Sequence, residues 1–266
     1  FTLVLTSKPS GAVSVGITSS DTGEGTVSES SVTFSSSGWS TPKTITVTGA
    51  NDTIDDGDQS YSVVTGGASS SDSLYAGLDP SDVSLTNTDD DTAGVVVTPT
   101  SGHVTTESGG TSTFTVALAT QPLQPVTINL STGDGGEVSL STSTLSFSTS
   151  DWSTPKSVIL TGVNDDVDDG DSAFSITLAA AVSADATYSG LGVSDVSGTN
   201  VDNDSAAFVV SPMSGLVTTE SGGSDSFTVK LATQPTSSVQ VPISVSDASE
   251  AQANKSSLTF TVGNWA

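Results

Sequence analysis

The stretch FTVALATQPLQPVTINL, residues 114–130, decides the fold. Related stretches stand at residues 1–17, FTLVLTSKPSGAVSVGI, and at residues 227–243, FTVKLATQPTSSVQVPI. In each of them two runs of alternating apolar and polar residues flank a proline-containing segment. Alternation with a period of two is typical of a half-buried β-strand. Each stretch therefore predicts two neighbouring strands, and the chain repeats this unit.

The repeat has a constant offset of 113 residues. Three tryptophans, Trp39, Trp152 and Trp265, stand at this spacing, and the same offset relates further landmarks: Pro42 and Pro155, Tyr75 and Tyr188, Asn87 and Asn200, Glu107 and Glu220. A fixed period of this kind indicates tandem modules. Residues 94–206 form one complete module. Residues 1–93 match 114–206 and lack the first strand, whereas residues 207–266 match 94–153 and lack the second half.

The complete module predicts a β-sandwich. We expect strands at residues 95–97, 113–119, 126–130, 144–147, 157–160, 173–178 and 193–199, and we find no helical periodicity. About seven short strands in one module predict an all-β fold of tandem Greek-key sandwiches with immunoglobulin-like architecture. We interpret Trp152 as a plug at the mouth of the sandwich, and Tyr188 as a packing residue whose hydroxyl bonds to the backbone. We expect His103 in an exposed turn.

The charge of the chain excludes several function classes. Thirty acidic residues against five lysines give a net charge of −25, so the chain lacks the basic footprint that nucleic acids require. An anionic membrane surface is disfavoured for the same reason, and no run of about 18 apolar residues predicts insertion into a membrane. Cysteine is absent, which rules out disulfides and thiolate metal sites. Alternatively, the negative charge serves only solubility and repulsion between copies of the protein.

Acidic residues gather in loops that the strands of a sandwich bring to one end. The densest run is NDDVDDGD, residues 164–171, with its counterpart NDTIDDGD at residues 51–58. Other repeated acids are Asp21, Asp134 and Asp247; Glu24, Glu137 and Glu250; and the module ends 89–91 and 202–204. Carboxylates a few ångströms apart repel one another by several kcal/mol, and Ca²⁺ with six to eight oxygen ligands relieves this repulsion. Alternatively, these are solvated turns in which Asp and Gly are favoured for backbone reasons.

The residues resemble the Calx-beta family, although neither an EF-hand nor a glycine-rich nonapeptide repeat is present. The resemblance rests on Glu107 ahead of a Phe-x-Val-x-Leu strand, the strand at 145–147, the run 158–166 and the closing 202–204. It implies calcium ligands at Glu107, Asp134, Asp165, Asp166, Asp202 and Asp204. With Asp168 and the acids of the flanking copies, the predicted metal set also includes Asp21, Asp52, Asp55, Asp89, Asp91 and Glu220. The family places a Glu before the Phe that follows the paired Asp loop, whereas Asp168, Asp169 and Asp171 precede Phe174 here.

The leading functional hypothesis is a spacer in a large adhesin or surface filament protein, stiffened by Ca²⁺ where modules meet. Arrays in bacterial surface proteins are known for the resembled family, which implies an extracellular location on a bacterial cell. The alternative is a module that binds carbohydrate or a protein ligand. An enzyme is disfavoured, because aromatic residues are few and His103 is the only histidine. Divalent cations and neighbouring modules are the expected partners.

A further hypothesis concerns end-to-end association between chains. Residues 207–226 correspond to the twenty residues that would precede Phe1 in a complete module. Such a segment could complete the first sandwich of another chain by strand addition.

Overall fold

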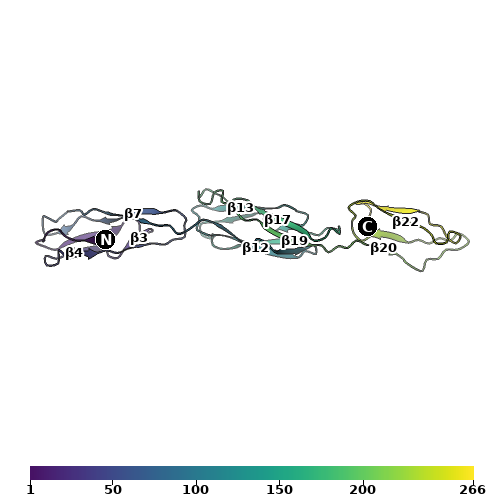
Figure 1. Cartoon of the computed structure of the whole chain (residues 1–266), viewed down its shortest axis with the longest axis horizontal. Coiled ribbons are helices and arrows are strands. Elements are labelled where there is room, and N and C mark those ends of the chain that lie inside the picture. The colour runs from purple at the N-terminus through teal and green to yellow at the C-terminus, as the bar shows by residue number, and fades with distance from the viewer.

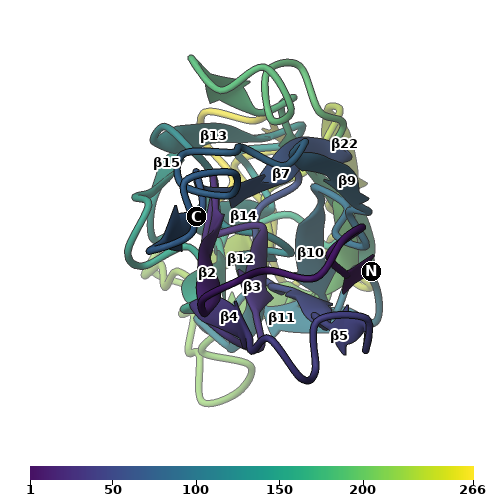
Figure 2. The ribbon, with the colours of Figure 1, turned by 90° about the vertical axis from the view of Figure 1, so that its left-hand side faces the viewer.

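The chain forms a row of three β-bodies. The computed structural model describes residues 1–266, which contain strands, turns and loops and no helix that could span a membrane. The bodies follow one another along the long axis (Figure 1), and the view along that axis shows them behind one another (Figure 2). The all-β fold class that the sequence predicts is confirmed.

The middle body is a sandwich of two sheets. One sheet has the strand order β10-β12-β16-β14, and the other has the order β11-β19-β17-β13-β15, with β18 paired to β13. All pairs are antiparallel except β11 with β19. Neighbours that are not consecutive in sequence give the Greek-key connection. The strands are β10 (Val95–Thr98), β11 (His103–Thr106), β12 (Thr111–Leu118), β13 (Val126–Thr132), β14 (Val138–Leu140), β15 (Thr144–Phe147), β16 (Lys156–Gly162), β17 (Ser172–Leu178), β18 (Val182–Ser183) and β19 (Val196–Val201).

Alternating residues of both sheets fill the space between them. Phe114, Val116 and Leu118 are at most 4% exposed, as the alternation in this strand predicts. They belong to a core of 17 buried residues, against which Trp152 packs while partly buried. Burial of one large apolar side chain contributes about 1.5–3 kcal/mol. The hydroxyl of Tyr188 donates to the carbonyl oxygen of Thr120 at 2.7 Å, so the expected bond to the backbone is present.

The sequence did not predict three strands of this body: β11, β14 and β18. Two of them have only two or three residues, and β11 follows β10 so closely that the pair resembles one strand and a turn. The expectation for His103 was wrong, because its side chain is 3% exposed. Its Nδ1 lies 2.8 Å from the Ser112 hydroxyl oxygen and its Nε2 lies 3.1 Å from the Pro99 carbonyl oxygen. The chain crosses between sheets at 99–102, and this crossing directs the ring inward.

The first body repeats the strand pairing of the middle body without counterparts of β10 and β11, and its core contains nine buried residues. The sheets have the orders β4-β2-β7-β9, with β8 against β2, β1-β5, and β3-β6. The strands are β1 (Thr2–Leu3), β2 (Val13–Ser19), β3 (Gly25–Val27), β4 (Ser31–Phe34), β5 (Lys43–Thr44), β6 (Val47–Gly49), β7 (Gln59–Thr65), β8 (Ser69–Ser70) and β9 (Val83–Asn87).

The third body consists of two strand pairs, β20-β21 and β22-β23. Phe227 is 45% exposed, whereas Phe114 at the same module position is fully buried. Phe114 pairs with Val158 of β16 and belongs to the middle core, whereas β21, which follows Phe227, pairs only with β20. The strands are β20 (Phe208–Ser211), β21 (Thr228–Leu231), β22 (Val239–Pro242) and β23 (Ser257–Phe260).

Candidate metal centres

The two densest acidic runs form two loops with the same local conformation, one in the middle body and one in the first body. In the loop that connects β16 to β17, the Oδ1 atom of Asp165 accepts a hydrogen bond from the Val167 amide at 2.7 Å. In the loop between β6 and β7, Asp52 Oδ1 accepts from the Ile54 amide at 2.8 Å. Such a side-chain bond to the amide two residues ahead is an Asx turn. In the loop between β16 and β17, Gly170 has a φ of 81°, a left-handed conformation that favours glycine.

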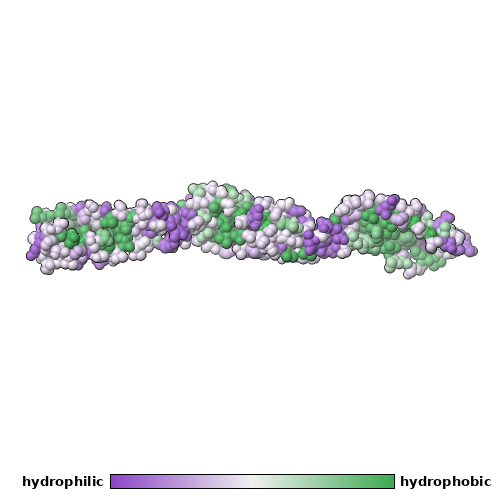
Figure 3. Space-filling view, in the orientation of Figure 1, coloured by the Kyte–Doolittle hydropathy of each residue, from purple (hydrophilic) through white to green (hydrophobic).

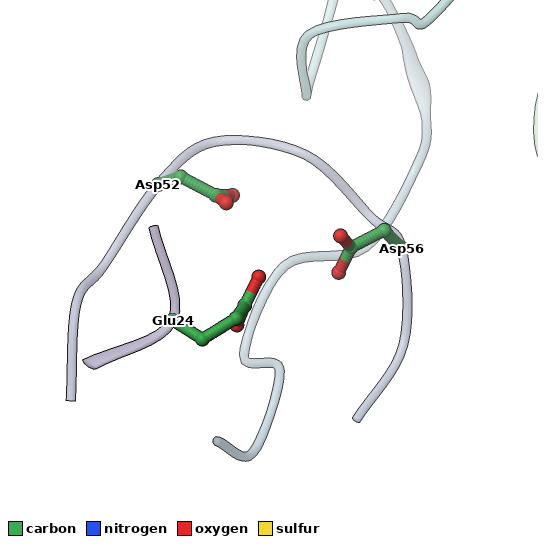
Figure 4. Close-up of side chains that lie close together, drawn as sticks. All are labelled: Glu24, Asp52 and Asp56. Atoms are coloured by element: carbon green, nitrogen blue, oxygen red, sulfur yellow. The ribbon is translucent and has the colours of Figure 1, made fainter. Parts of the chain in front are cut away.

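Each loop forms a trio of carboxylates with a Glu from a neighbouring turn. In the first body the trio is Glu24, Asp52 and Asp56, whose side chains point toward a shared space (Figure 4). In the middle body the trio is Glu137, Asp165 and Asp169. Within each trio one oxygen from every residue lies within 4.8 Å of the others. Two modules therefore bring equivalent residues together.

An asparagine side-chain amide holds the Glu of each trio. Asn200 is 1% exposed, and its Nδ2 donates to Glu137 Oε2 at 3.3 Å and to the Val163 carbonyl at 3.2 Å. Its Oδ1 accepts from the Thr105 hydroxyl at 2.9 Å. Asn87 donates to Glu24 Oε2 at 3.2 Å in the same way. The repeat identified both asparagines as landmarks, but no sequence pattern revealed that they orient a carboxylate.

A second trio lies beside the first in the middle body: Glu107, Asp202 and Asp204. Glu107 is 4% exposed, and its Oε2 accepts from the Asn203 amide at 3.2 Å. Asp202 accepts from the amides of Asp204 and Gly170 at 2.7 and 2.8 Å. The Oδ2 atom of Asp204 is buried and has no hydrogen-bond partner. An unpaired buried carboxylate oxygen is costly, and a bound cation would satisfy this atom.

The pKa shifts in this trio reflect crowding of negative charge. Burial raises the pKa of Glu107, and the charges of Asp165, Asp202 and Asp204 raise it further, against the hydrogen bond from the Asn203 amide. Burial also raises the pKa of Asp204, and the charge of Asp202 adds to this. By contrast, hydrogen bonds from the backbone of Asp204 and Gly170 lower the pKa of Asp202. The donors are all carboxylate oxygens, which suits a hard divalent cation such as Ca²⁺.

The remaining predicted ligands lie elsewhere. Asp134 and Asp21 bond to the amides two residues ahead, at Gly136 and Gly23, and belong to no trio. Asp166, Asp168, Asp55 and Glu220 also lie outside the trios. Asp89 and Asp91 line the same hollow of about 350 Å³ as Glu24, Asp52 and Asp56. Four trio members were absent from the predicted set, although the 113-residue repeat pairs them: Glu24 with Glu137 and Asp56 with Asp169.

Fold and site together define a tandem β-sandwich protein with carboxylate clusters at the ends of its modules. No protein-family model and no curated protein sequence matches the chain. Among solved structures it is similar to the apo-form Calx CBD1 domain, with 18% identity over 43% of this chain and 100% of that chain and a TM-score of 0.34. It is also similar to the calcium binding domain CBD12 of CALX1.1, with 15% identity over 68% of this chain and 72% of that chain and a TM-score of 0.33. A third similar structure is the D00-D0 domain of intimin, with 16% identity over 71% of this chain and 85% of that chain and a TM-score of 0.25. All three TM-scores are low, so we infer the function from this chain's own residues.

Proposed function

We propose that the chain is part of an extracellular spacer whose successive β-sandwiches are stiffened by Ca²⁺ at their junctions. The observation that carries the proposal is the recurrence of one carboxylate trio in two modules, next to the following body in both cases. Strongly hydrophilic bands mark these two boundaries (Figure 3). Cation binding there would neutralise repulsion between loops and hold the linker between bodies.

Calcium suits these clusters better than magnesium. Ca²⁺ accepts six to eight oxygen ligands in irregular arrangements, whereas Mg²⁺ requires near-ideal octahedral geometry. Each trio supplies carboxylates, and the surrounding loops expose backbone carbonyls and admit water. Extracellular calcium modules work with dissociation constants of about 10⁻⁴ to 10⁻³ M, so tight binding is unnecessary. A role at a bacterial cell surface is part of the same proposal.

The test is calcium titration of the whole chain by calorimetry, together with small-angle scattering with Ca²⁺ and with EGTA. We expect a narrower spread of dimensions with Ca²⁺, because the bodies are then held in line. Asp165→Asn removes one trio carboxylate and should weaken binding by about tenfold. Asp134→Asn is the matched control, since this carboxylate caps a turn outside both trios.

Two results would contradict the proposal. One is identical scattering with Ca²⁺ and EGTA. The other is equal loss of calcium affinity in Asp165→Asn and Asp134→Asn, which would show that only the overall charge matters.

A further inference from the structure

Both acidic loops contain one apolar residue in the middle of their acids: Val167 in one and Ile54 in the other. Val167 is half-buried. It lines a groove of about 320 Å³ at the boundary with the third body, opposite Phe208, Leu231 and Pro235. A run of carboxylates that served only to bind a cation would not need an apolar side chain at this position. Val167 therefore indicates contact with the next module.

The backbone of the same loop bonds to the next module at both junctions. The Gln121 amide donates to the Thr53 carbonyl oxygen at 2.7 Å, and the Gln234 amide donates to the Asp166 carbonyl oxygen at 2.6 Å. The two donors are 113 residues apart, and so are the two acceptors. The junctions thus repeat one backbone contact between successive bodies.

A third contact holds the linker between bodies. Asp55 Oδ2 accepts from the Ala93 amide at 2.7 Å, and Asp168 Oδ2 accepts from the Ala206 amide at 2.7 Å. These two acids belong to the predicted metal set, yet one oxygen of each is engaged by the linker. Such charge-assisted bonds to amides are stronger than bonds between neutral groups.

We propose that this loop is a docking element whose partner is the next copy of the module. Within the loop, Asp165 and Asp169 belong to the carboxylate trio. The Asp166 carbonyl, Val167 and Asp168 contact the following body and its linker. The docking contacts use atoms outside the trios, so they persist without a cation. The junction then has a preferred orientation that the polypeptide alone encodes, and the cation adds to it.

The first test measures the docked population at the second junction. The chain has no cysteine, so Thr113→Cys and Thr259→Cys, two exposed strand positions, can carry spin labels for pulsed distance measurements. In EGTA, we expect Val167→Ser to lower the ratio of docked to undocked chains about fivefold, because a half-buried valine is lost. Val182→Ser is the matched control, since this valine is 60% exposed and lies in β18 at the other end of the middle body.

The second test is hydrogen exchange of single amides by NMR. Gln121 and Gln234 should exchange about tenfold more slowly than Lys8, which occupies the same module position with no body before it in this chain. This difference should persist in EGTA.

The docking proposal is overturned if Val167→Ser has the same distance distribution as Val182→Ser in EGTA, or if the three amides exchange alike. Docking that survives in EGTA, combined with no response to Ca²⁺, would refute the calcium-stiffened spacer and leave the docking element standing.

Discussion

Replacement of Tyr188 by Phe removes one hydroxyl from the middle core. The Tyr188 side chain is fully buried. Its hydroxyl donates to the Thr120 carbonyl at 2.7 Å, accepts from the Thr120 amide at 3.1 Å and lies 2.8 Å from the Thr120 hydroxyl oxygen. Without it, two buried backbone groups of Thr120 lose this partner. Each unsatisfied group costs about 1–3 kcal/mol, so we expect the free energy of unfolding to fall by about 2–4 kcal/mol.

The assay is urea denaturation followed by fluorescence. In a background with Trp39→Phe and Trp265→Phe, Trp152 is the only tryptophan and reports on the middle body. Tyr75→Phe in the first body is the companion variant, because Tyr75 bonds to Ser7 in the same way. It is measured in a background with Trp152→Phe and Trp265→Phe, in which Trp39 of the first body is the only tryptophan. Tyr75 is 8% exposed, so water can replace part of its bonds and the loss should be smaller.

An unchanged free energy of unfolding in Tyr188→Phe would refute this reasoning. It would mean that Thr120 finds other partners once the hydroxyl is gone. Because Thr120 precedes Gln121, whose amide reaches the first body, the variant should also speed exchange of the Gln121 amide.

Three more perturbations have definite expected outcomes. Burial alone would raise the pKa of Asp185, but hydrogen bonds from Thr187 and Leu123 outweigh it and lower the pKa below 3.8; Asp185→Asn should therefore destabilise the protein at pH 7 in urea titrations, with the difference from wild type shrinking as pH falls below about 3.8. A Cβ at Gly162 would lie 2.2 Å from the Thr106 carbonyl oxygen, so Gly162→Ala should lower the free energy of unfolding by about 1–3 kcal/mol in the Trp152 assay; Gly49→Ala, followed with Trp39 as the only tryptophan, should lower it less because the nearest contact of its Cβ is the Asn87 side chain rather than backbone. Saturating Ca²⁺ at 100 times its dissociation constant should stabilise the folded protein by about 2.7 kcal/mol and raise the midpoint of thermal melting; no rise, or an equal rise with Asp165→Asn, would count against the trio.

Much of the fold could be predicted from residue patterns. The alternation of Phe114, Val116 and Leu118 is a local property, and burial of one face follows directly from it. The 113-residue repeat then extended each assignment to other copies. The short strand β14 and the split of the first strand into β10 and β11 could not be predicted, because their pairing depends on partners far along the chain. For the same reason His103 was misplaced.

The sequence alone determined that acids recur with the modules and that the chain is a tandem array of sandwiches. Only the tertiary structure decided which acids converge. Asp134 and Glu137 are three residues apart, yet the carboxylate of Asp134 caps its own turn while that of Glu137 joins Asp165 and Asp169. The direction of a carboxylate depends on turn geometry and on a buried partner, Asn200 in this case. The turn bond of Asp134 is local, whereas Asn200 reaches Glu137 from 63 residues away through long-range packing, which residue spacing does not encode.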